Sequence, residues 1–327
     1  MSLRLLGVGS PLVDYSAQVP EDFIRSRLSG GKGGTRNIGP AEKAALLAAC
    51  PGSVTISAGG AAANTVMAAA ELGLRSALLG KLGSDADGKR FLRDMRASGA
   101  DVSELRTDPD SGTGYCLALV TPDAERTMRS DLGASLKLTP SEVGQCDFSR
   151  YDRVLLEGYF VNTEIFEPVM RQARAAGVGV AVDLCNYELA AACRERFTRL
   201  IAQYADMVFA NRDEAAALTG EDVPDRMART LAALCRTAVV KLGADGALIA
   251  SGNRLEAVPP TRVENAVDTT AAGDYFAAGF FYALARNRSA ARCAAAGARC
   301  AAEIIQYPGT KLPREAWNKL KADLEVL

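Results

Sequence analysis

The sequence predicts an α/β fold in which helices cover both faces of a mostly parallel sheet. Its 327 residues are 48% hydrophobic and 24% charged, a composition typical of a soluble globular protein with a large core. Short β-type runs alternate with helical runs over most of the length, which favours a parallel sheet with helices on each side. Two stretches interrupt this alternation and indicate a smaller, β-rich part.

The expected strands of the main sheet are short apolar runs, with amphipathic or Ala-rich helices between them. The strands are expected at residues 4–9, 75–83, 153–158, 178–184, 206–210 and 237–243. The helices are expected at residues 62–73, 87–98, 163–176, 212–219 and 224–235. Thr139-Pro140-Ser141-Glu142 has the layout of a capping box with proline at the first helical position, so another helix is expected to begin there. After residue 286 the pattern is helical to the end.

The two interruptions lie at residues 12–56 and 112–131. The first contains the glycine-rich stretch SGGKGGTRNIG, which predicts a mobile loop. The second, GTGYCLALVTPDAERTMRSD, predicts two strands around a Pro-Asp turn. We expect both to form a small flap over one edge of the main sheet. The chain shows no internal repeat, low-complexity tract or linker.

Charge and cysteine usage point away from several classes of protein. The net charge is −1 and there are no long Lys/Arg runs, so neither nucleic acid nor an anionic membrane is favoured as a partner. The eight cysteines include no C-x-x-C pair, which fits free thiols in a reducing compartment. The N-terminus lacks the layout of a signal peptide, and no apolar run approaches the roughly 20 residues of a membrane span. We therefore expect a cytoplasmic protein.

The chain contains no histidine. This excludes Ser-His-Asp triads, the common zinc sites and any histidine general base. The sequence therefore favours chemistry carried by carboxylates.

The stretch VDTTAAGDYFAAGF at residues 267–280 has the properties of an anion site. The helix that begins near Asp274 is apolar on every side as far as Arg286, so it is expected to be buried. Its first turn nevertheless has free N–H groups and the positive end of the helix dipole, and the small residues before Asp274 allow a ligand to approach. The alternative is helix capping by Asp268, Thr269 or Thr270, with Asp274 facing the dipole.

Three other glycine-rich stretches do not make nucleotide sites by themselves. GVGSPL at 7–12 begins like a dinucleotide fingerprint but lacks the third glycine. The G-x-x-x-x-G-K pattern that ends at Lys89 is followed by Arg90, where a phosphate loop needs Ser or Thr. SGGKGGT at 29–35 is followed by no apolar helix. Their simpler interpretation is as turns and loops.

A second glycine element, AGGAAANT at 58–65, also begins a helix. Together with DTTAAGD it resembles the two signatures of the PfkB, or ribokinase-like, family of carbohydrate and nucleoside kinases. The resemblance covers nearly the whole chain, because further family motifs are matched in the expected order. These are GVGSPLVDYSA, GKLGSDADG, NRDE at 211–214, KLGADG at 241–246 and GARCAAEIIQYPGTKLP. SPLVDYSA, LEGYFV and the C-terminal stretch look most similar to the adenosine-kinase-like branch.

The resemblance implies a ribokinase-like fold over residues 1–327, a three-layer α/β/α arrangement around a doubly wound, mostly parallel sheet. It also implies that the β-rich flap is the family's lid, made of residues 12–56 and 107–132. Lids in this family either stand alone or pack against a second subunit, so the sequence is compatible with a monomer or a homodimer.

The resemblance also implies the residues of the site. Asp274 would be the catalytic base, beside an anion hole formed by Ala272, Gly273 and Asp274, with Ala271 where the family usually has glycine. The substrate would be held by Asp14, Gly59, Gly60, Asn64 and Asn186, with Tyr159 and Phe160 either stacking on a nucleobase or packing at a strand end. The ATP side would include Asn211, Glu214, Lys241, Gly243 and Gly246. Glu214 would hold Mg²⁺ through water, and Asp268 and Thr270 would surround a monovalent cation such as K⁺.

The function that the resemblance implies is ATP-dependent transfer of a phosphoryl group to a hydroxyl of a small sugar or an adenosine-like ribonucleoside. Two alternatives come from other classes of function. One is a non-catalytic sugar or nucleotide sensor that kept the fold. The other is a nicotinamide oxidoreductase, which would depend on GVGSPL.

Overall fold

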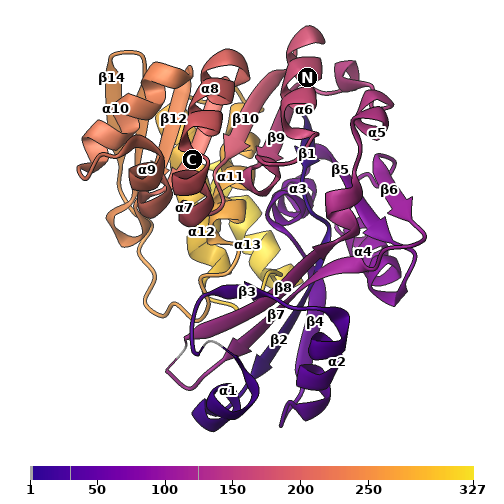
Figure 1. Cartoon of the computed structure of the whole chain (residues 1–327). Coiled ribbons are helices and arrows are strands. Elements are labelled where there is room, and N and C mark those ends of the chain that lie inside the picture. Colours follow the sequence, from indigo (N-terminus) through magenta and orange to yellow (C-terminus); the bar gives the residue numbers. More distant parts are fainter. Residues whose placement is uncertain (1–2, 30, 124) are drawn as a thin grey trace.

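The computed structural model describes residues 3–29, 31–123 and 125–327 of the chain (Figure 1). Its larger sheet has nine strands in the order β14-β13-β12-β11-β10-β9-β1-β5-β6. The strands are β1 (Arg4–Val8), β5 (Arg75–Gly83), β6 (Leu105–Asp108), β9 (Arg153–Glu157), β10 (Gly179–Asp183), β11 (Met207–Asn211), β12 (Thr237–Lys241), β13 (Ala247–Ser251) and β14 (Arg254–Val258). All neighbours pair in parallel except β12 with β13 and β13 with β14.

Helices cover both faces of this sheet and make three layers. Successive side chains of a strand point to opposite faces, so Leu6 packs in one apolar cluster and Leu5 in another. The first face is covered by α5 (Pro140–Gly144), α6 (Phe166–Ala175), α7 (Tyr187–Ala192), α8 (Arg194–Tyr204), α9 (Arg212–Thr219) and α10 (Pro224–Leu234). The second is covered by α3 (Ala61–Glu71), α11 (Ala272–Leu284) and α12 (Ala290–Ile304), with α13 (Arg314–Glu325) packed against α12. The predicted three-layer, ribokinase-like fold is confirmed.

The predicted elements of the core agree with the structure to within a few residues at their ends. The capping box at Thr139 and Glu142 is present, and α11 is buried from Tyr275 to Ala283 as its apolar sequence requires. The antiparallel strands β13 and β14, the strand β6 and the helices α7 and α8 were not among the predicted elements. Short 3₁₀ turns lie at Ala134–Lys137, Phe148–Arg150, Gly158–Phe160 and Gly243–Asp245.

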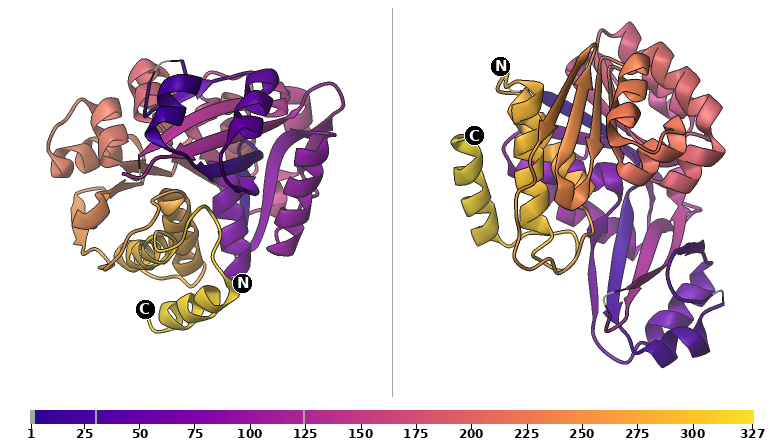
Figure 2. Two further views of the ribbon diagram at one scale, coloured as in Figure 1. Left: turned by 90° about the horizontal axis from the view of Figure 1, so that it is seen from below. Right: turned by 90° about the vertical axis from the view of Figure 1, so that its left-hand side faces the viewer.

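A smaller sheet of five strands projects from the core, as the right-hand view of Figure 2 shows. It is ordered β3-β8-β7-β2-β4, with β2 (Leu12–Gln18), β3 (Thr35–Asn37), β4 (Val54–Gly59), β7 (Thr113–Val120) and β8 (Arg126–Gly133). The helices α1 (Glu21–Arg27) and α2 (Pro40–Ala49) pack on one face with α4 (Ala86–Ala97). The stretch 29–39, which was predicted to be a loop, contains the strand β3. Residues 107 and 108, expected in the flap, belong to β6 of the main sheet instead.

The strands of the smaller sheet present alternate residues to two environments. Val13 and Tyr15 of β2 pack with the apolar cluster that contains α1 and α2, whereas Leu12 and Asp14 line a cleft on the other side. The period of two thus gives this sheet one structural face and one face available to a ligand.

All eight cysteines are free thiols, as predicted. Among the described residues, no helix has both the length and the hydropathy of a membrane span.

Candidate active site

A cleft of about 1080 Å³ lies between the carboxyl ends of the main-sheet strands and the inner face of the smaller sheet. The ends of β9, β10, β11 and β12 supply Glu157, Asp183, Asn211 and Lys241. Parallel α/β sheets bind ligands at this edge because their helix N-termini and loops converge there. The smaller sheet closes the opposite side with Leu12, Asp14, Thr35, Cys116, Arg126, Met128, Ser130 and Leu132.

The first turn of α11 opens into this cleft. Its N-cap residue, Ala271, has a left-handed backbone, and no side chain caps the helix. The alternative capping role for Asp268, Thr269 or Thr270 is therefore wrong; Asp268 instead accepts from the N–H and hydroxyl of Thr270. Ala272 N–H donates to the Thr269 carbonyl at 3.3 Å. Within the described residues, the N–H groups of Gly273 and Asp274 have no hydrogen-bond partner. They are free to bind an anion.

The Asp274 carboxylate is held at the same helix end by one hydrogen bond. The Asn64 amide on α3 donates to it at 2.9 Å. Burial is the main cause that raises the pKa of Asp274 to about 8. The bond from Asn64 and the charge of Lys241 oppose this rise, whereas the nearby carboxylates of Asp183 and Glu157 add to it. A buried carboxylate with so high a pKa is a strong proton acceptor when it is ionised.

The left-handed conformation of Ala271 (φ 61°) is unfavourable for a residue with a side chain. We predict that Ala271→Gly raises the free energy of unfolding by about 1 kcal/mol, because glycine adopts this conformation without a steric penalty. Denaturant unfolding measures the change. Asn287→Gly is the matched control: Asn287 has φ 56°, but asparagine tolerates that region, so a smaller gain is expected. An Ala271→Gly gain no larger than the control would contradict the prediction.

The small-sheet side of the cleft contains Asp14 next to a glycine pair. A side chain at Gly59 would collide with the Asp14 carboxylate, and one at Gly60 (φ 100°) would collide with the Ser10 carbonyl. These positions therefore need glycine. Burial raises the pKa of Asp14 to about 7, although the charge of Arg126 lowers it. No group of the described residues donates a hydrogen bond to this carboxylate, which leaves it available to a ligand.

An acidic side chain, Glu214, lies just after β11, and a basic side chain, Lys241, lies at the end of β12. Asn211 and Glu214 form a reciprocal capping box at the start of α9, with bonds of 2.8 Å. Burial raises the pKa of Glu214 to about 7, opposed by Lys241. Lys241 pairs with Asp183 at 3.2 Å and lies next to Gly273. Burial alone would lower the pKa of Lys241, but Asp183 and Glu214 raise it, so this side chain is a cation.

Comparison with known proteins assigns this arrangement to a family. The model that describes pfkB family carbohydrate kinases matches residues 42–317. The chain belongs to this family. An ATP-dependent ribose-1-phosphate kinase from Halopiger xanaduensis is 32% identical over 231 residues, which are 68% of this chain and 72% of that protein. Adenosine kinase 2 of Arabidopsis thaliana is 27% identical over 95% of this chain and 96% of its own length. The crystal structure of adenosine kinase from Sinorhizobium meliloti has a TM-score of 0.88 and 28% identity, and covers 99% of this chain and 100% of that one.

The pfkB-family protein is thus a sugar or nucleoside kinase, a phosphotransferase that acts on a hydroxyl group. Most of the predicted site residues of this kinase lie together in the cleft. Those that line it are Asp14, Gly60, Asn64, Tyr159, Asn211, Glu214, Lys241, Gly243, Gly246, Thr270, Ala271, Ala272, Gly273 and Asp274. Gly59 lies behind Asp14.

Two predicted substrate residues of the kinase do not reach the cleft. Asn186 caps α7, where its side chain accepts from the Leu189 N–H at 2.8 Å. Phe160 is fully buried and packs in the core on the α6 side of the sheet. The prediction for Asn186 is corrected, because its side chain caps a helix, whereas for Phe160 the packing alternative holds. Tyr159, which is 40% exposed, remains at the cleft.

Asp268 lies beside the cleft and joins three parts of the kinase. Its carboxylate accepts from Thr270, from the Gly309 N–H at 2.8 Å and from Arg126 of the smaller sheet at 3.1 Å. The predicted cation site at Asp268 and Thr270 thus coincides with a contact between the core and the smaller sheet.

The predicted site residues did not include Asp183, Glu157 or Arg126. Asp183 and Glu157 each end an apolar strand of a parallel sheet, a position that faces ligands, so the strand pattern contained a usable signal. Arg126 reaches Asp268 across 142 residues of chain, and no local pattern predicts such a contact.

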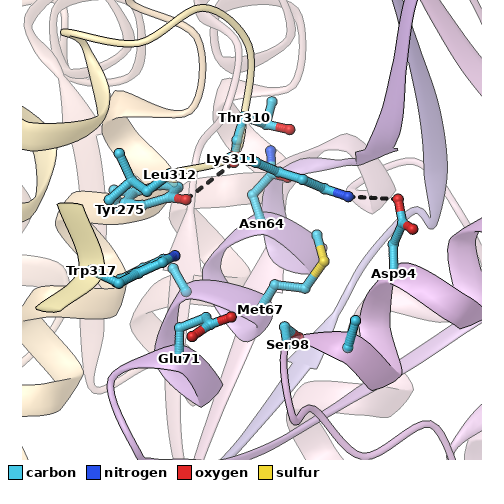
Figure 3. Close-up of a pocket in the computed structure, with 12 residues that line it drawn as sticks. Asn64, Met67, Glu71, Asp94, Ser98, Tyr275, Thr310, Lys311, Leu312 and Trp317 are labelled. Atoms are coloured by element: carbon cyan, nitrogen blue, oxygen red, sulfur yellow. Dashed lines mark hydrogen bonds and ion pairs between the residues drawn. The ribbon is translucent and has the colours of Figure 1, made fainter. Parts of the chain in front are cut away.

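A second, smaller cavity of about 150 Å³ lies on the far side of Asn64 (Figure 3). It runs along α3 past Met67 and Glu71 to the stacked rings of Tyr275 and Trp317. Asn64 lines both cavities. Among the described residues, its buried Oδ1 atom has no hydrogen-bond partner.

Proposed function

We propose that this kinase transfers the γ-phosphoryl group of ATP to a ribose hydroxyl of an adenosine-like nucleoside. The single observation that carries the proposal is the placement of Asp274. Its carboxylate, two free N–H groups of α11 and the acceptor-side residues Asp14 and Asn64 all face one cleft. A nucleophile, its base and an anion site can therefore meet at one point.

The chemistry of the smaller sheet favours a nucleoside as acceptor. Asp14 offers a carboxylate to sugar hydroxyls, while Leu12, Met128 and Leu132 offer an apolar surface of the kind that covers a nucleobase. Tyr159 adds an exposed aromatic ring at the cleft. The Sinorhizobium and Arabidopsis relatives are adenosine kinases, which supports the same acceptor class.

The proposed mechanism uses positioning and charge rather than covalent chemistry. The Gly273 and Asp274 N–H groups bind the transferring phosphoryl oxygens, and Lys241 adds a positive charge beside Gly273. Asp274 accepts the proton of the acceptor hydroxyl as the bond to phosphorus forms. Asn64 holds that carboxylate in place through its amide. Gly243 and Gly246, in the turn after β12, line the cleft and would contact the nucleotide.

The donor set of the cleft fits Mg²⁺ bound mainly through phosphates and water. Carboxylates at the cleft outnumber cationic side chains, since Asp14, Glu157, Asp183, Glu214 and Asp274 face Arg126, Lys241 and Arg262. Among the described residues, no group of three acidic or sulfur side chains forms a metal site by itself. Mg²⁺ typically takes one or two carboxylates together with substrate phosphates. Glu214, through water, is the proposed carboxylate, and the ion would neutralise phosphate charge. Asp268 and Thr270 remain the proposed site of a monovalent cation.

We predict that turnover requires Mg²⁺ or Mn²⁺. Excess chelator should abolish ADP production, because the phosphate charge would be unneutralised among these carboxylates. Glu214→Ala should raise the Mg²⁺ concentration for half-maximal rate by about 10-fold or more, the effect of losing roughly 1.4 kcal/mol of binding. Asp213→Ala, an exposed carboxylate in the same helical turn, is the control and should leave it unchanged. Full activity in chelator would contradict the prediction.

The proposed function is tested by ADP production from ATP with adenosine, other nucleosides, ribose, fructose and phosphosugars as acceptors. Adenosine or another purine nucleoside should give the highest kcat/KM. A preference for a phosphosugar would retain the kinase and overturn the nucleoside assignment. Tight binding of a nucleoside without ADP production would favour the non-catalytic sensor.

A further inference from the structure

One of the carboxylates that line the cleft, Glu157, is buried and is not used by the proposed mechanism. It ends β9 and is 1% exposed. Its Oε1 atom accepts from the Ser10 N–H at 3.0 Å and from the Ser10 hydroxyl at 2.7 Å. Its Oε2 atom accepts from the Ala62 N–H at 3.3 Å. A fully buried carboxylate is retained only when its oxygens are bonded, and here three donors meet it.

These donors belong to two of the connections between the core and the smaller sheet. Ser10 lies between β1 of the core and β2 of the smaller sheet. Ala62 is in the first turn of α3, just after the chain returns from β4 through Gly60. The two connections touch, because a side chain at Gly60 would collide with the Ser10 carbonyl. One carboxylate therefore ties both connections to the end of β9.

The same connections carry the acceptor side of the cleft. Asp14 follows Ser10 by four residues on β2, and Gly60 and Asn64 flank Ala62. Asn64 in turn holds the Asp274 carboxylate. A shift of either connection would move Asp14 relative to Asn64 and Asp274, and small displacements of reacting groups are costly for the rate.

We infer that Glu157 is a positioning residue of the kinase reaction, which sets the acceptor-binding residues of β2 and α3 against the base on α11. The inference rests on the proposed function, since it concerns the same site. The structure requires a carboxylate at this point: all three contacts are donors, and a glutamine amide would direct N–H groups toward at least one of them. Gly9 is also required, because a side chain there would occupy the position of the Glu157 carboxylate.

The charge of Glu157 has a second effect on the site. Four groups from four elements face Asp274: Asn64 of α3, Glu157 of β9, Asp183 of β10 and Lys241 of β12. The Glu157 charge is among those that raise the pKa of Asp274. When this charge is removed, the pKa of Asp274 should fall, and the acidic limb of the kcat/KM profile should move to lower pH.

The test is Glu157→Gln in the full-length protein, assayed for ADP production with the best acceptor found for the wild type. We expect the acceptor KM to rise by about 10- to 100-fold with the ATP KM nearly unchanged, and the acidic limb to move to lower pH. Ser10→Ala removes one donor and keeps the charge, so it should raise the acceptor KM less and leave the limb in place. The double variant should differ little from Glu157→Gln, because both changes break the same contact.

Glu303→Gln is the matched control. Glu303 is another buried carboxylate, paired with Arg299 at 2.7 Å on α12, and does not line the cleft, so its variant should keep both KM values and the pH profile. The inference would be overturned if the wild type is active and Glu157→Gln has the same acceptor KM and the same acidic limb of the kcat/KM profile. If Glu157→Gln does not fold, an unchanged acceptor KM in Ser10→Ala overturns it. A wild type without ADP production overturns the proposed function instead.

Discussion

Replacing Asp274 with asparagine is expected to lower kcat by about 10²- to 10⁴-fold, roughly 3 to 5 kcal/mol, with both KM values nearly unchanged. Asparagine has the same shape, and its amide oxygen can still accept from the Asn64 amide that now bonds the carboxylate at 2.9 Å. It cannot, however, accept the proton of the acceptor hydroxyl. The variant thus cannot accept the proton at position 274, whereas the position of the side chain and its bond from Asn64 are kept.

The pH profile of the wild type provides an independent check on the same carboxylate. Burial raises the pKa of Asp274 to about 8, so the protonated form, which cannot act as a base, dominates below that pH. The kcat/KM for the acceptor should therefore fall as the pH decreases through about 8, and this limb should be absent from Asp274→Asn. If the variant kept more than half of the wild-type turnover at an unchanged melting temperature, Asp274 would not be the base.

Replacing Asp14 with alanine is expected to raise the acceptor KM by about 10²- to 10⁴-fold while the KM for ATP stays the same. A carboxylate that bonds two sugar hydroxyls contributes charge-assisted hydrogen bonds of roughly 1.5 to 3 kcal/mol each. Asp14 lies on β2 of the smaller sheet, whereas Asp274 and Lys241 lie on the core. The loss should therefore affect the acceptor and not the nucleotide.

The measurement is steady-state kinetics with each substrate varied in turn, at a pH above 8 so that Asp14 is ionised, because burial raises its pKa to about 7. Ser16→Ala is a matched control on the same strand: Ser16 does not line the cleft, and its variant should keep both KM values. An acceptor KM that does not change in Asp14→Ala would show that this carboxylate does not bind the acceptor.

Neighbouring residues in the sequence predicted much of the candidate site, but they did not predict the long-range contacts that complete it. The uncapped first turn of α11, where we propose an anion site, was predictable, because an apolar helix that begins after small residues must bury its sides and still has free N–H groups in its first turn. The predicted substrate role of Asn186 failed for a local reason too, and Phe160 took the packing alternative. Asparagine before a helix is a good cap, and an aromatic residue after a buried strand usually packs. Sequence alone does not rank these uses against ligand binding.

The sequence by itself determined the layered α/β core of this protein and its membership of a kinase family. Hydrophobic periodicity and turn residues act over short distances along the chain, so strands, helices and motif loops can be read from neighbouring residues. Only the tertiary structure decided which charges meet. The contacts of Asn64 with Asp274, Arg126 with Asp268 and Glu157 with Ser10 each join residues more than 140 positions apart. Electrostatic coupling depends on distance and burial in space, and neither is encoded in the local pattern that predicts an element.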